Sequence, residues 1–286
     1  MARTRTDSPA DHHDPASSPD RLVSAVNEQA SYPVASYPDL AGQVAVVTGG
    51  SRGIGAATAR ALAANGVAVA VVGRDQAAIG ATVDSITAEG GTAIGVAADC
   101  TVESDLDKLR GDVAERLGPV DIVAAFAGGN GMPVPTQQET GAHWREVIEC
   151  DLTSTFLTVS TFLPQLLSRR HGVVLTMSSA AARQPAQSSA AYAAAKAGVI
   201  AFSRHLAKEV GGQGVRVNCL APSATENDKM RAWVPADQRR ELGAAFPLGR
   251  LGQPEDIAAA ALFLASASAS WITGVTLDIA GGKIMV

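Results

Sequence analysis

Short apolar runs rich in valine and other β-branched residues alternate along this chain with longer alanine-rich segments, and this alternation limits the possible folds more than any other feature. Apolar runs with little polar interruption are typical of strands that are covered on both faces. The longer segments have helical spacing. The repeated order of strand, helix and strand predicts an α/β domain with a doubly wound parallel sheet and helices on both faces. In such a sheet, ligands bind beyond the carboxyl ends of the strands.

The predicted elements fill residues 41–286, which we interpret as one domain. The predicted strands are 43–49, 67–73, 92–99, 121–128, 172–179, 215–222 and 274–281. The predicted helices are 53–65, 75–89, 103–117, 143–168, 190–211 and 254–266. Residues 1–40 are rich in Pro, Ser and Asp and lack apolar periodicity, which predicts a flexible or loosely docked N-terminal arm. The polar segment at about 223–250 is expected to form a mobile lid over the substrate.

Composition argues against several classes of protein. No apolar run is long enough to cross a bilayer, and residues 1–40 lack the apolar core of a signal peptide. The net charge of −5 comes from 28 acidic and 23 basic residues that are spread along the chain, so no nucleic-acid partner is expected. The three cysteines, Cys100, Cys150 and Cys219, lie in apolar contexts, which is typical of reduced thiols in a cytoplasmic protein.

No metal site is expected. The spacing of the cysteines does not resemble a zinc site. His12 and His13 are adjacent and lie beside aspartates in the N-terminal arm, which raises metal binding as an interpretation. Solvated histidines in a polar tail are the interpretation we favour.

The stretch TGGSRGIG joins the first predicted strand directly to the first predicted helix. Gly49, Gly53 and Gly55 have the spacing G-x3-G-x-G, which differs from the common dinucleotide pattern G-x-G-x-x-G. Glycines at such a turn let the backbone approach a pyrophosphate, which binds at the positive N-terminus of the helix. This position in an alternating α/β chain predicts a nucleotide site.

The end of the second strand indicates which nucleotide is bound. An acidic side chain there would hold the ribose diol of NAD, whereas arginine favours the additional phosphate of NADP. Gly73 ends this strand and Arg74 follows it, while Arg52 lies within the glycine turn. Two guanidinium groups suit a phosphate, so NADP(H) is favoured over NAD(H). Asp75 could instead reach a ribose hydroxyl, but capping of the next helix is the favoured role.

Tyr192 and Lys196 are the only polar side chains of the stretch AAYAAAK, residues 190–196. Alanine favours the helix, and residues four apart share one face of it. Taken alone, the pair fits an amphipathic surface helix. Asp99 lies at the end of the third strand. It is suited either to contact the adenine of a nucleotide or to cap a helix.

Together with further motifs, these residues make the chain resemble the classical short-chain dehydrogenase/reductase family over residues 41–282. The resemblance rests on TGGSRGIG, on Ser179 thirteen residues before Tyr192, on Tyr192-x3-Lys196, on VRVNCLAP, and on PLGRLGQPEDIA with TGVTLDIAGG. In overall pattern the chain is similar to bacterial 3-oxoacyl-carrier-protein reductases. The resemblance implies a single-domain Rossmann-like fold, a nicotinamide cofactor, and hydride exchange between a carbonyl and an alcohol.

The resemblance also implies roles for the site residues. Tyr192 would exchange the proton, Lys196 would bind the nicotinamide ribose, and Ser179 would hold the substrate oxygen as an oxyanion-type donor. Lowering the pKa of a phenol from near 10 to near 7 takes roughly 4 kcal/mol. One cation about 4 Å away supplies roughly 4 kcal/mol at an effective dielectric near 20. The implied cofactor-binding residues are Gly49, Ser51, Arg52, Gly53, Ile54, Gly55, Arg74, Asp99, Cys100, Ala127, Gly128, Tyr192, Lys196, Pro222 and Asn227.

The chain departs from the family pattern in three places. The family usually has Asn-Asn-Ala-Gly after the fourth strand, and this chain has Ala125 and Phe126 in place of the asparagines, which suggests apolar repacking. Ser223 stands where glycine is usual, and Asn227 stands where a threonine often contacts the nicotinamide carboxamide. Asp151 stands where the fourth catalytic residue is usually asparagine.

The Asp151 carboxylate bears on the chemistry. If it lay about 6 Å from Lys196, an ionised carboxylate would offset roughly 3 kcal/mol of the stabilisation that the lysine gives to the phenolate of Tyr192. We expect that Asp151 turns away into hydrogen bonds that satisfy it and leaves reduction intact. The rival hypothesis is that it moves the pH optimum or serves other chemistry.

Two hypotheses for the whole chain follow. The first is an NADP(H)-dependent ketoreductase or alcohol dehydrogenase, and the second is an NADP-binding sensor, lyase or isomerase. By resemblance, relatives pair through the helices that correspond to 143–168 and 190–211, so a homodimer or homotetramer is expected. Substrate-pocket candidates, each with a purely structural alternative, are Met230, Trp233, Arg183, Gln184 and Gln187. Ser178 is expected to be structural.

Overall fold

A seven-stranded sheet forms the centre of the molecule in the computed structural model, which describes residues 34–129 and 133–285. The folded unit is Ala35–Val286. Its strands are β1 Val44–Thr48, β2 Ala68–Gly73, β3 Ala93–Ala97, β4 Ile122–Ala125, β5 Gly172–Met177, β6 Val215–Pro222 and β7 Thr276–Ile279. Its helices are α2 Gly53–Ala64, α3 Gln76–Ala88, α4 Glu103–Arg116, α5 Gly141–Ile148, α6 Ser154–Arg169, α7 Ala190–Val210, α8 Asp228–Trp233, α9 Ala236–Ala244 and α10 Pro254–Ala265.

All strand pairs in the sheet are parallel, in the order β3-β2-β1-β4-β5-β6-β7. The order reverses between β1 and β4, because the chain first builds β1 to β3 outward in one direction and then β4 to β7 outward in the other. The prediction of a doubly wound parallel sheet is confirmed. At such a switch point the connections leave the sheet in opposite directions and open a crevice at the carboxyl ends of the strands.

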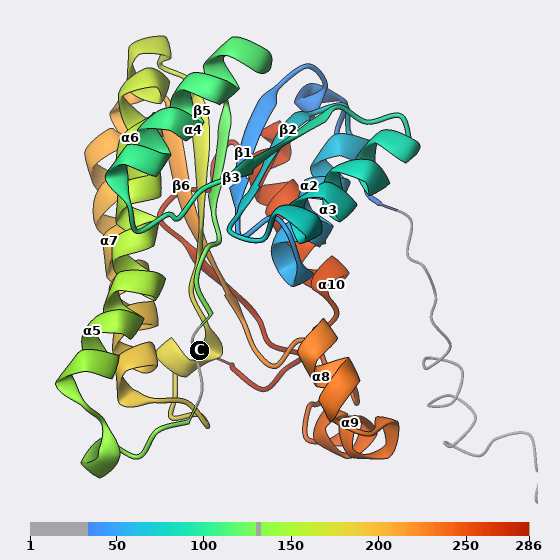
Figure 1. Ribbon diagram of the computed structural model, residues 1–286, viewed down its shortest axis with the longest axis vertical. Helices are drawn as coiled ribbons and strands as arrows, with labels where there is room; N and C mark the ends of the chain where they lie inside the picture. Colours follow the sequence, from blue (N-terminus) through green and yellow to red (C-terminus); the bar gives the residue numbers. More distant parts are fainter. Residues whose placement is uncertain (1–33, 130–132, 286) are drawn as a thin grey trace, which may run out of the picture. The chain divides into compact units, whose positions relative to one another are not determined.

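Alternate residues of each strand enter two separate cores. On β1, Ala45 and Val47 pack with α2, α3 and α10, whereas Val44 and Val46 pack with α4, α6 and α7. Successive side chains of a strand point to opposite faces, so helices on both sides bury the whole strand. Figure 1 shows the two helix layers on either side of the sheet. This arrangement explains why the strands read as nearly continuous apolar runs.

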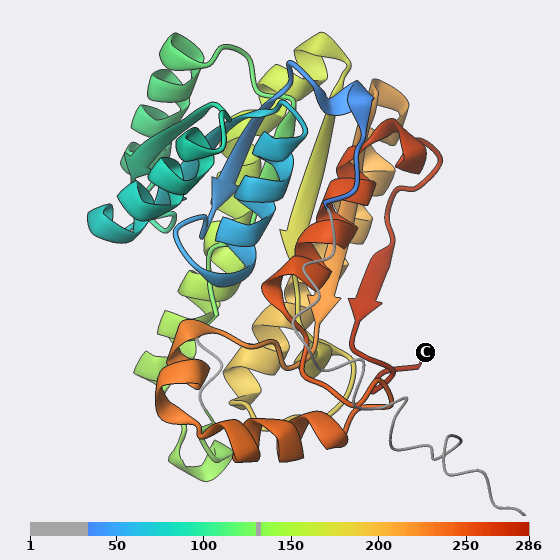
Figure 2. The ribbon, with the colours of Figure 1, turned by 90° about the vertical axis from the view of Figure 1, so that its right-hand side faces the viewer.

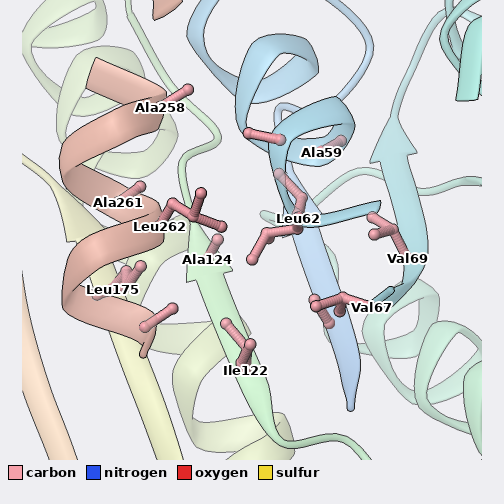
Figure 3. Close-up of a cluster of buried hydrophobic side chains, with 14 of the residues drawn as sticks. Ala59, Leu62, Val67, Val69, Ile122, Ala124, Leu175, Ala258, Ala261 and Leu262 are labelled. Atoms are coloured by element: carbon pink, nitrogen blue, oxygen red, sulfur yellow. The ribbon is translucent and has the colours of Figure 1, made fainter. Parts of the chain in front are cut away.

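Small residues let α2 and α10 pack closely on one face of the sheet. Ala59 and Leu62 of α2 and Ala261 and Leu262 of α10 are buried in the same core cluster, which includes Leu175 of β5. Figure 3 shows these side chains converging above the strands. The alanine-rich composition therefore lets helices approach the sheet closely enough to exclude water.

The predicted helix 143–168 is not one regular helix. It is divided into α5 and α6 by a π-helical turn, Glu149–Thr153, in which the amide of Ser154 donates to the carbonyl of Glu149. A single π turn accommodates one extra residue and rotates the side chains that follow it. This turn contains Asp151, whose side chain is completely buried. The other predicted strands and helices are confirmed, with their ends displaced by a few residues.

Residues just before the predicted domain start bond to the domain. The amide of Tyr37 donates to Asn65 Oδ1 over 2.7 Å, and the amide of Ala267 donates to Asp39 Oδ2 over 2.7 Å. Most of the predicted arm, residues 1–40, including His12 and His13, lies outside the described residues. Within the described part of the chain, no helix combines the length and apolarity needed to span a bilayer.

The predicted lid segment forms two short helices, α8 and α9, beyond the carboxyl ends of the strands. Figure 2 shows both helices at the end of the molecule toward which the strand arrows point. Glu226, before α8, lies 3.1 Å from Arg231 Nε and 3.6 Å from Arg239 Nε. These ion pairs connect the start of the segment to both helices.

Candidate active site

A cavity of about 750 Å³ opens at the carboxyl ends of the central strands. Its walls come from the segments that follow β1, β2, β3, β4, β5 and β6, together with the first turns of α2 and α7. This is the crevice expected at the switch point of a doubly wound sheet. The lining includes every residue predicted to bind a cofactor: Gly49, Ser51, Arg52, Gly53, Ile54, Gly55, Arg74, Asp99, Cys100, Ala127, Gly128, Tyr192, Lys196, Pro222 and Asn227.

The glycine turn has close contacts that only glycine permits. A Cβ on Gly49 would lie 2.8 Å from the carbonyl oxygen of Phe126, and one on Gly55 would lie 2.1 Å from that of Gly49. Gly53 begins α2 with a φ of +52°. The backbone therefore turns tightly at the cavity wall and presents the N-terminus of α2, which suits a pyrophosphate. These residues fit the nucleotide part of a dinucleotide.

Two arginines line the same wall. Arg52 forms an ion pair with Asp75, and Arg74 Nη1 lies 4.0 Å from Asp99 Oδ2. The Arg52 and Arg74 side chains are 60% and 75% exposed, so both can reorient toward a bound anion.

Asp75 caps α3, as predicted. Its Oδ1 accepts from the amides of Ala77 and Ala78 over 3.0 and 3.1 Å. The hydrogen bond from Ala78 lowers the pKa of Asp75, and Ala77 and Arg52 act in the same direction. Both oxygens of the Asp75 carboxylate therefore have partners within the protein, since one caps the helix and the other pairs with Arg52.

Asp99 closes a tight turn after β3. Its Oδ1 accepts from the amide and the hydroxyl of Thr101 over 3.0 and 2.7 Å. These bonds lower the pKa of Asp99, with a further contribution from Arg74. The residue before α4 is Val102, so Asp99 braces the loop and is not the N-cap of the helix.

The thiols near the cavity are held in the neutral form. Burial raises the pKa of Cys100 to about 11. Burial also raises the pKa of Cys150 and of Cys219.

Tyr192 lies in the first turn of α7. Its amide donates over 3.1 Å to Oγ of Ser189, the N-cap residue of the helix. Lys196 follows one turn later and is almost completely buried. Its Nζ lies 5.7 Å from the centroid of the Tyr192 ring. The interpretation of the pair as a surface feature is wrong, because both residues line the cavity.

Lys196 is held by a carbonyl and a carboxylate. Its Nζ donates to the carbonyl of Met177 over 3.1 Å and lies 3.0 Å from Asp151 Oδ1. The same carboxylate oxygen accepts from the amide of Gly129 over 2.6 Å. The expectation that Asp151 turns away from Lys196 is wrong. The π turn directs the carboxylate inward, and the two donors hold it there.

Gly128 leaves the space for this ion pair. A Cβ at this position would lie 2.5 Å from Asp151 Oδ1 and 3.3 Å from Lys196 Nζ. Its φ of +130° is also one that other residues rarely adopt. The backbone after β4 therefore passes directly over the carboxylate and the ammonium.

The segment after β4 repacks around apolar groups, as predicted. Ala125 and Phe126 are buried, one in each core. The hydroxyl of Thr48 accepts from the amides of Phe126 and Ala127 over 3.0 and 3.2 Å. A threonine of β1 thus braces this turn.

The two serines after β5 differ in their hydrogen bonds. Ser179 lines the cavity, and its Oγ accepts from the amide of Ala181 over 3.2 Å. A serine hydroxyl that accepts in this way keeps its own hydrogen for donation. Ser178 is buried and its Oγ donates to the carbonyl of Lys196 over 2.7 Å, as expected of a structural residue.

The other substrate-pocket candidates lie elsewhere. Arg183 makes two hydrogen bonds to Asp278 on β7, each over 3.0 Å. Trp233 is 86% exposed. Met230, Gln184 and Gln187 are likewise not among the residues that line the cavity. Asn227 does line it, and its Oδ1 caps α8 by accepting from the amide of Met230.

Comparison with known proteins decides the family. A family model described as Enoyl-(Acyl carrier protein) reductase matches residues 49–283, most of the chain. This protein belongs to the short-chain dehydrogenase/reductase family. It is therefore an oxidoreductase of a family that uses a nicotinamide cofactor.

Curated relatives support this assignment along nearly their whole length. The chain is 39% identical to the 3-oxoacyl-[acyl-carrier-protein] reductase FabG of Escherichia coli K12, over 86% of this chain and 98% of the relative. It is 37% identical to the cis-4-hydroxycyclohexanecarboxylate dehydrogenase of Sinomonas cyclohexanicum, over 85% of this chain and 97% of the relative.

A solved structure shows the same fold. A 7α-hydroxysteroid dehydrogenase complexed with NADH and 7-oxo glycochenodeoxycholic acid aligns with a TM-score of 0.80 and 33% identity, covering 87% of this chain and 97% of that one. The fold is thus shared by reductases and dehydrogenases that act on different substrates.

Several groups of this dehydrogenase/reductase site were missed by sequence reasoning. The amide of Gly129 and the carbonyl of Met177 hold the ion pair, but backbone groups carry no sequence signature. Glu226 also lines the cavity, and only its place after β6 pointed to it. Within the described residues no group of three or more His, Cys, Asp or Glu side chains is placed to hold a metal ion.

Proposed function

We propose that this protein catalyses NADP(H)-dependent interconversion of a ketone and an alcohol, with Tyr192 as the proton donor and acceptor. The observation that carries the proposal is that Ser179, Tyr192 and Lys196 line the same cavity as the glycine turn. When bound, the nicotinamide supplies or accepts the hydride.

The roles of the chain's own residues follow from their chemistry. Carbonyl reduction leaves negative charge on the substrate oxygen, and the hydroxyl of Tyr192 can give it a proton. Ser179 donates a hydrogen bond to the same oxygen and stabilises that charge. The buried Lys196 lines this cavity and would bind the nicotinamide ribose. Its positive charge favours the phenolate that remains after the proton has left.

The chain offers donors for both ends of the cofactor. Arg52 and Arg74 are proposed to bind the 2′-phosphate of NADP, because guanidinium groups make forked, charge-assisted bonds to phosphate. The Asn227 side-chain oxygen caps α8, which leaves its amide hydrogens for the nicotinamide carboxamide. The relative crystallised with NADH shows that the fold also accepts the cofactor without the phosphate.

A sensor, lyase or isomerase is the weaker alternative. It was suggested by Asp151 alone, and the relatives named above are reductases and dehydrogenases. The two functions are separated by mixing the protein with NADPH and a panel of ketones, then following nicotinamide absorbance. We expect oxidation of NADPH with at least one ketone. Demonstrated NADPH binding without turnover of any ketone or alcohol would contradict the proposal.

Removing either arginine should separate the two cofactors. We expect Arg52→Ala and Arg74→Ala each to weaken NADPH binding by about 10- to 100-fold, because each loses a charge-assisted bond of roughly 1.5–3 kcal/mol. NADH binding should change little. Fluorescence titration measures both affinities, and Arg110→Ala, an exposed arginine on α4, is the matched control. Equal affinity of the unaltered protein for NADH and NADPH would contradict the assignment.

We also propose that the protein forms a homodimer or homotetramer through α6 and α7. Phe156 of α6 is half exposed and meets Phe202 of α7 edge to face, with ring centroids 6.1 Å apart. A surface aromatic pair of this kind is typical of interfaces. Sedimentation velocity tests the proposal, and a monomer at micromolar concentration would contradict it.

A further inference from the structure

We propose that Asp151 is a positioning residue that extends carbonyl reduction toward alkaline pH by neutralising Lys196 and keeping Tyr192 in its proton-donating form. The inference rests on the proposed function, since that function makes Tyr192 the acid. It concerns the contact between Asp151 and Lys196, which the proposed proton transfer does not itself require.

The contact is direct and enclosed. Asp151 Oδ1 lies 3.0 Å from Lys196 Nζ, and the two side chains are 0% and 3% exposed. The amide of Gly129 and the carbonyl of Met177 fix the carboxylate and the ammonium from either side. Water therefore screens this pair weakly, and its charges act on neighbouring groups at short range.

The charges act on Tyr192 with opposite signs. A lysine alone stabilises a phenolate, whereas a carboxylate in contact with that lysine repels it. Lys196 Nζ lies 5.7 Å from the Tyr192 ring centroid, so the pair presents the ring with a dipole instead of a net positive charge. The phenolate is consequently stabilised less than it would be beside an unopposed lysine.

The surrounding titratable groups do not cancel this effect. The thiols of Cys150 and Cys219 feel the Lys196 charge, and burial raises the pKa of each, so both remain neutral near neutral pH. Arg74 and Asp99 bear opposite charges and pair with each other. Glu226 is paired with Arg231 and Arg239. Among the described residues, Asp151 is the carboxylate in contact with Lys196.

The step affected is one proton transfer. During reduction the O–H bond of Tyr192 breaks while an O–H bond to the substrate oxygen forms, and the reverse holds during alcohol oxidation. Reduction therefore needs the phenol and oxidation needs the phenolate. A charge change at residue 151 should move the pH midpoints of both reactions together, because one group governs both.

Asp151→Asn tests this with little change in shape. We expect the alkaline midpoint of reduction and the midpoint of oxidation to fall by about one to two pH units, the size expected when one charge roughly 6 to 9 Å away is removed at an effective dielectric near 20. Asp151→Ser removes the same charge with a different side chain and serves if the asparagine variant does not fold. Asp107→Asn is the matched control, since this exposed carboxylate on α4 makes the same change in net charge.

A second readout does not depend on activity. The chain has three tyrosines, so Tyr32→Phe with Tyr37→Phe leaves Tyr192 as the single source of tyrosinate absorbance. In that background Asp151→Asn should lower the pH at which tyrosinate forms by the same one to two units, approximately. The Asp107→Asn control should leave that pH unchanged.

The outcomes separate the two proposals. A tyrosinate shift in a protein that turns over no ketone or alcohol would overturn the proposed function and support the electrostatic role of Asp151. Turnover with both midpoints unmoved in Asp151→Asn and Asp151→Ser would support the proposed function and overturn the role of Asp151. Midpoints that move upward would also overturn it.

Discussion

Replacing Tyr192 with phenylalanine is expected to reduce kcat for a ketone substrate by a factor of about 10² to 10⁴, the usual contribution of a positioned acid. The phenylalanine ring fills the same space in the first turn of α7. The hydrogen bond from the backbone amide of residue 192 to Ser189 Oγ does not involve the phenol. The proton donor is lost while the cavity keeps its shape. The affinity for NADPH and the free energy of unfolding should therefore change little.

Steady-state kinetics with a verified ketone measures this effect, with Tyr37→Phe as the matched control. Tyr37 packs against the core that includes α2 and α10, and its backbone amide donates a hydrogen bond to Asn65 Oδ1. It is not among the residues that line the cavity. An unaltered kcat for Tyr192→Phe would remove the basis for assigning proton transfer to this residue.

Replacing Lys196 with methionine should give the largest loss of stability. The methionine fills much of the lysine volume but leaves the carboxylate of Asp151 buried without its cation. Breaking a buried ion pair from one side costs about 3–5 kcal/mol. We expect the free energy of unfolding in denaturant near neutral pH to fall by about that amount. Adding Asp151→Asn to Lys196→Met should recover most of the loss, because no buried charge then remains.

The four proteins of this double-mutant cycle give the interaction free energy between Lys196 and Asp151, separate from the packing contribution of each side chain. Apo protein is measured throughout, so the result does not depend on any substrate. A Lys196→Met variant as stable as the unaltered protein would show that the pair contributes nothing. A double variant less stable than Lys196→Met would show that the carboxylate is not the source of the loss.

The fold was predictable because its signals are local and periodic. Strands buried on both faces must be apolar along their length, and the two cores that share β1 account for the runs that predicted the sheet. The glycine turn was predictable for a similar reason, since Gly49 and Gly55 occupy positions where a side chain would strike backbone.

The features that sequence reasoning missed depend on contacts between distant parts of the chain. The π turn breaks a segment with uninterrupted helical character, and nothing in its composition marks the extra residue. The orientation of Asp151 follows from that turn and from the amide of Gly129, which belongs to a different connection. Arg183 was a pocket candidate until the fold placed Asp278, which is 95 residues away in sequence, beside it.

The close passage of Gly128 over the Asp151 carboxylate restricts how this protein can diverge. Any larger residue at 128 would have to displace the carboxylate, whose nearest oxygen lies 2.5 Å from where a Cβ would stand. Such a displacement would in turn leave Lys196 with a different counter-charge. A larger residue at 128 is thus accessible to a descendant of this chain chiefly together with a change at 151, whereas 151 can change while Gly128 stays.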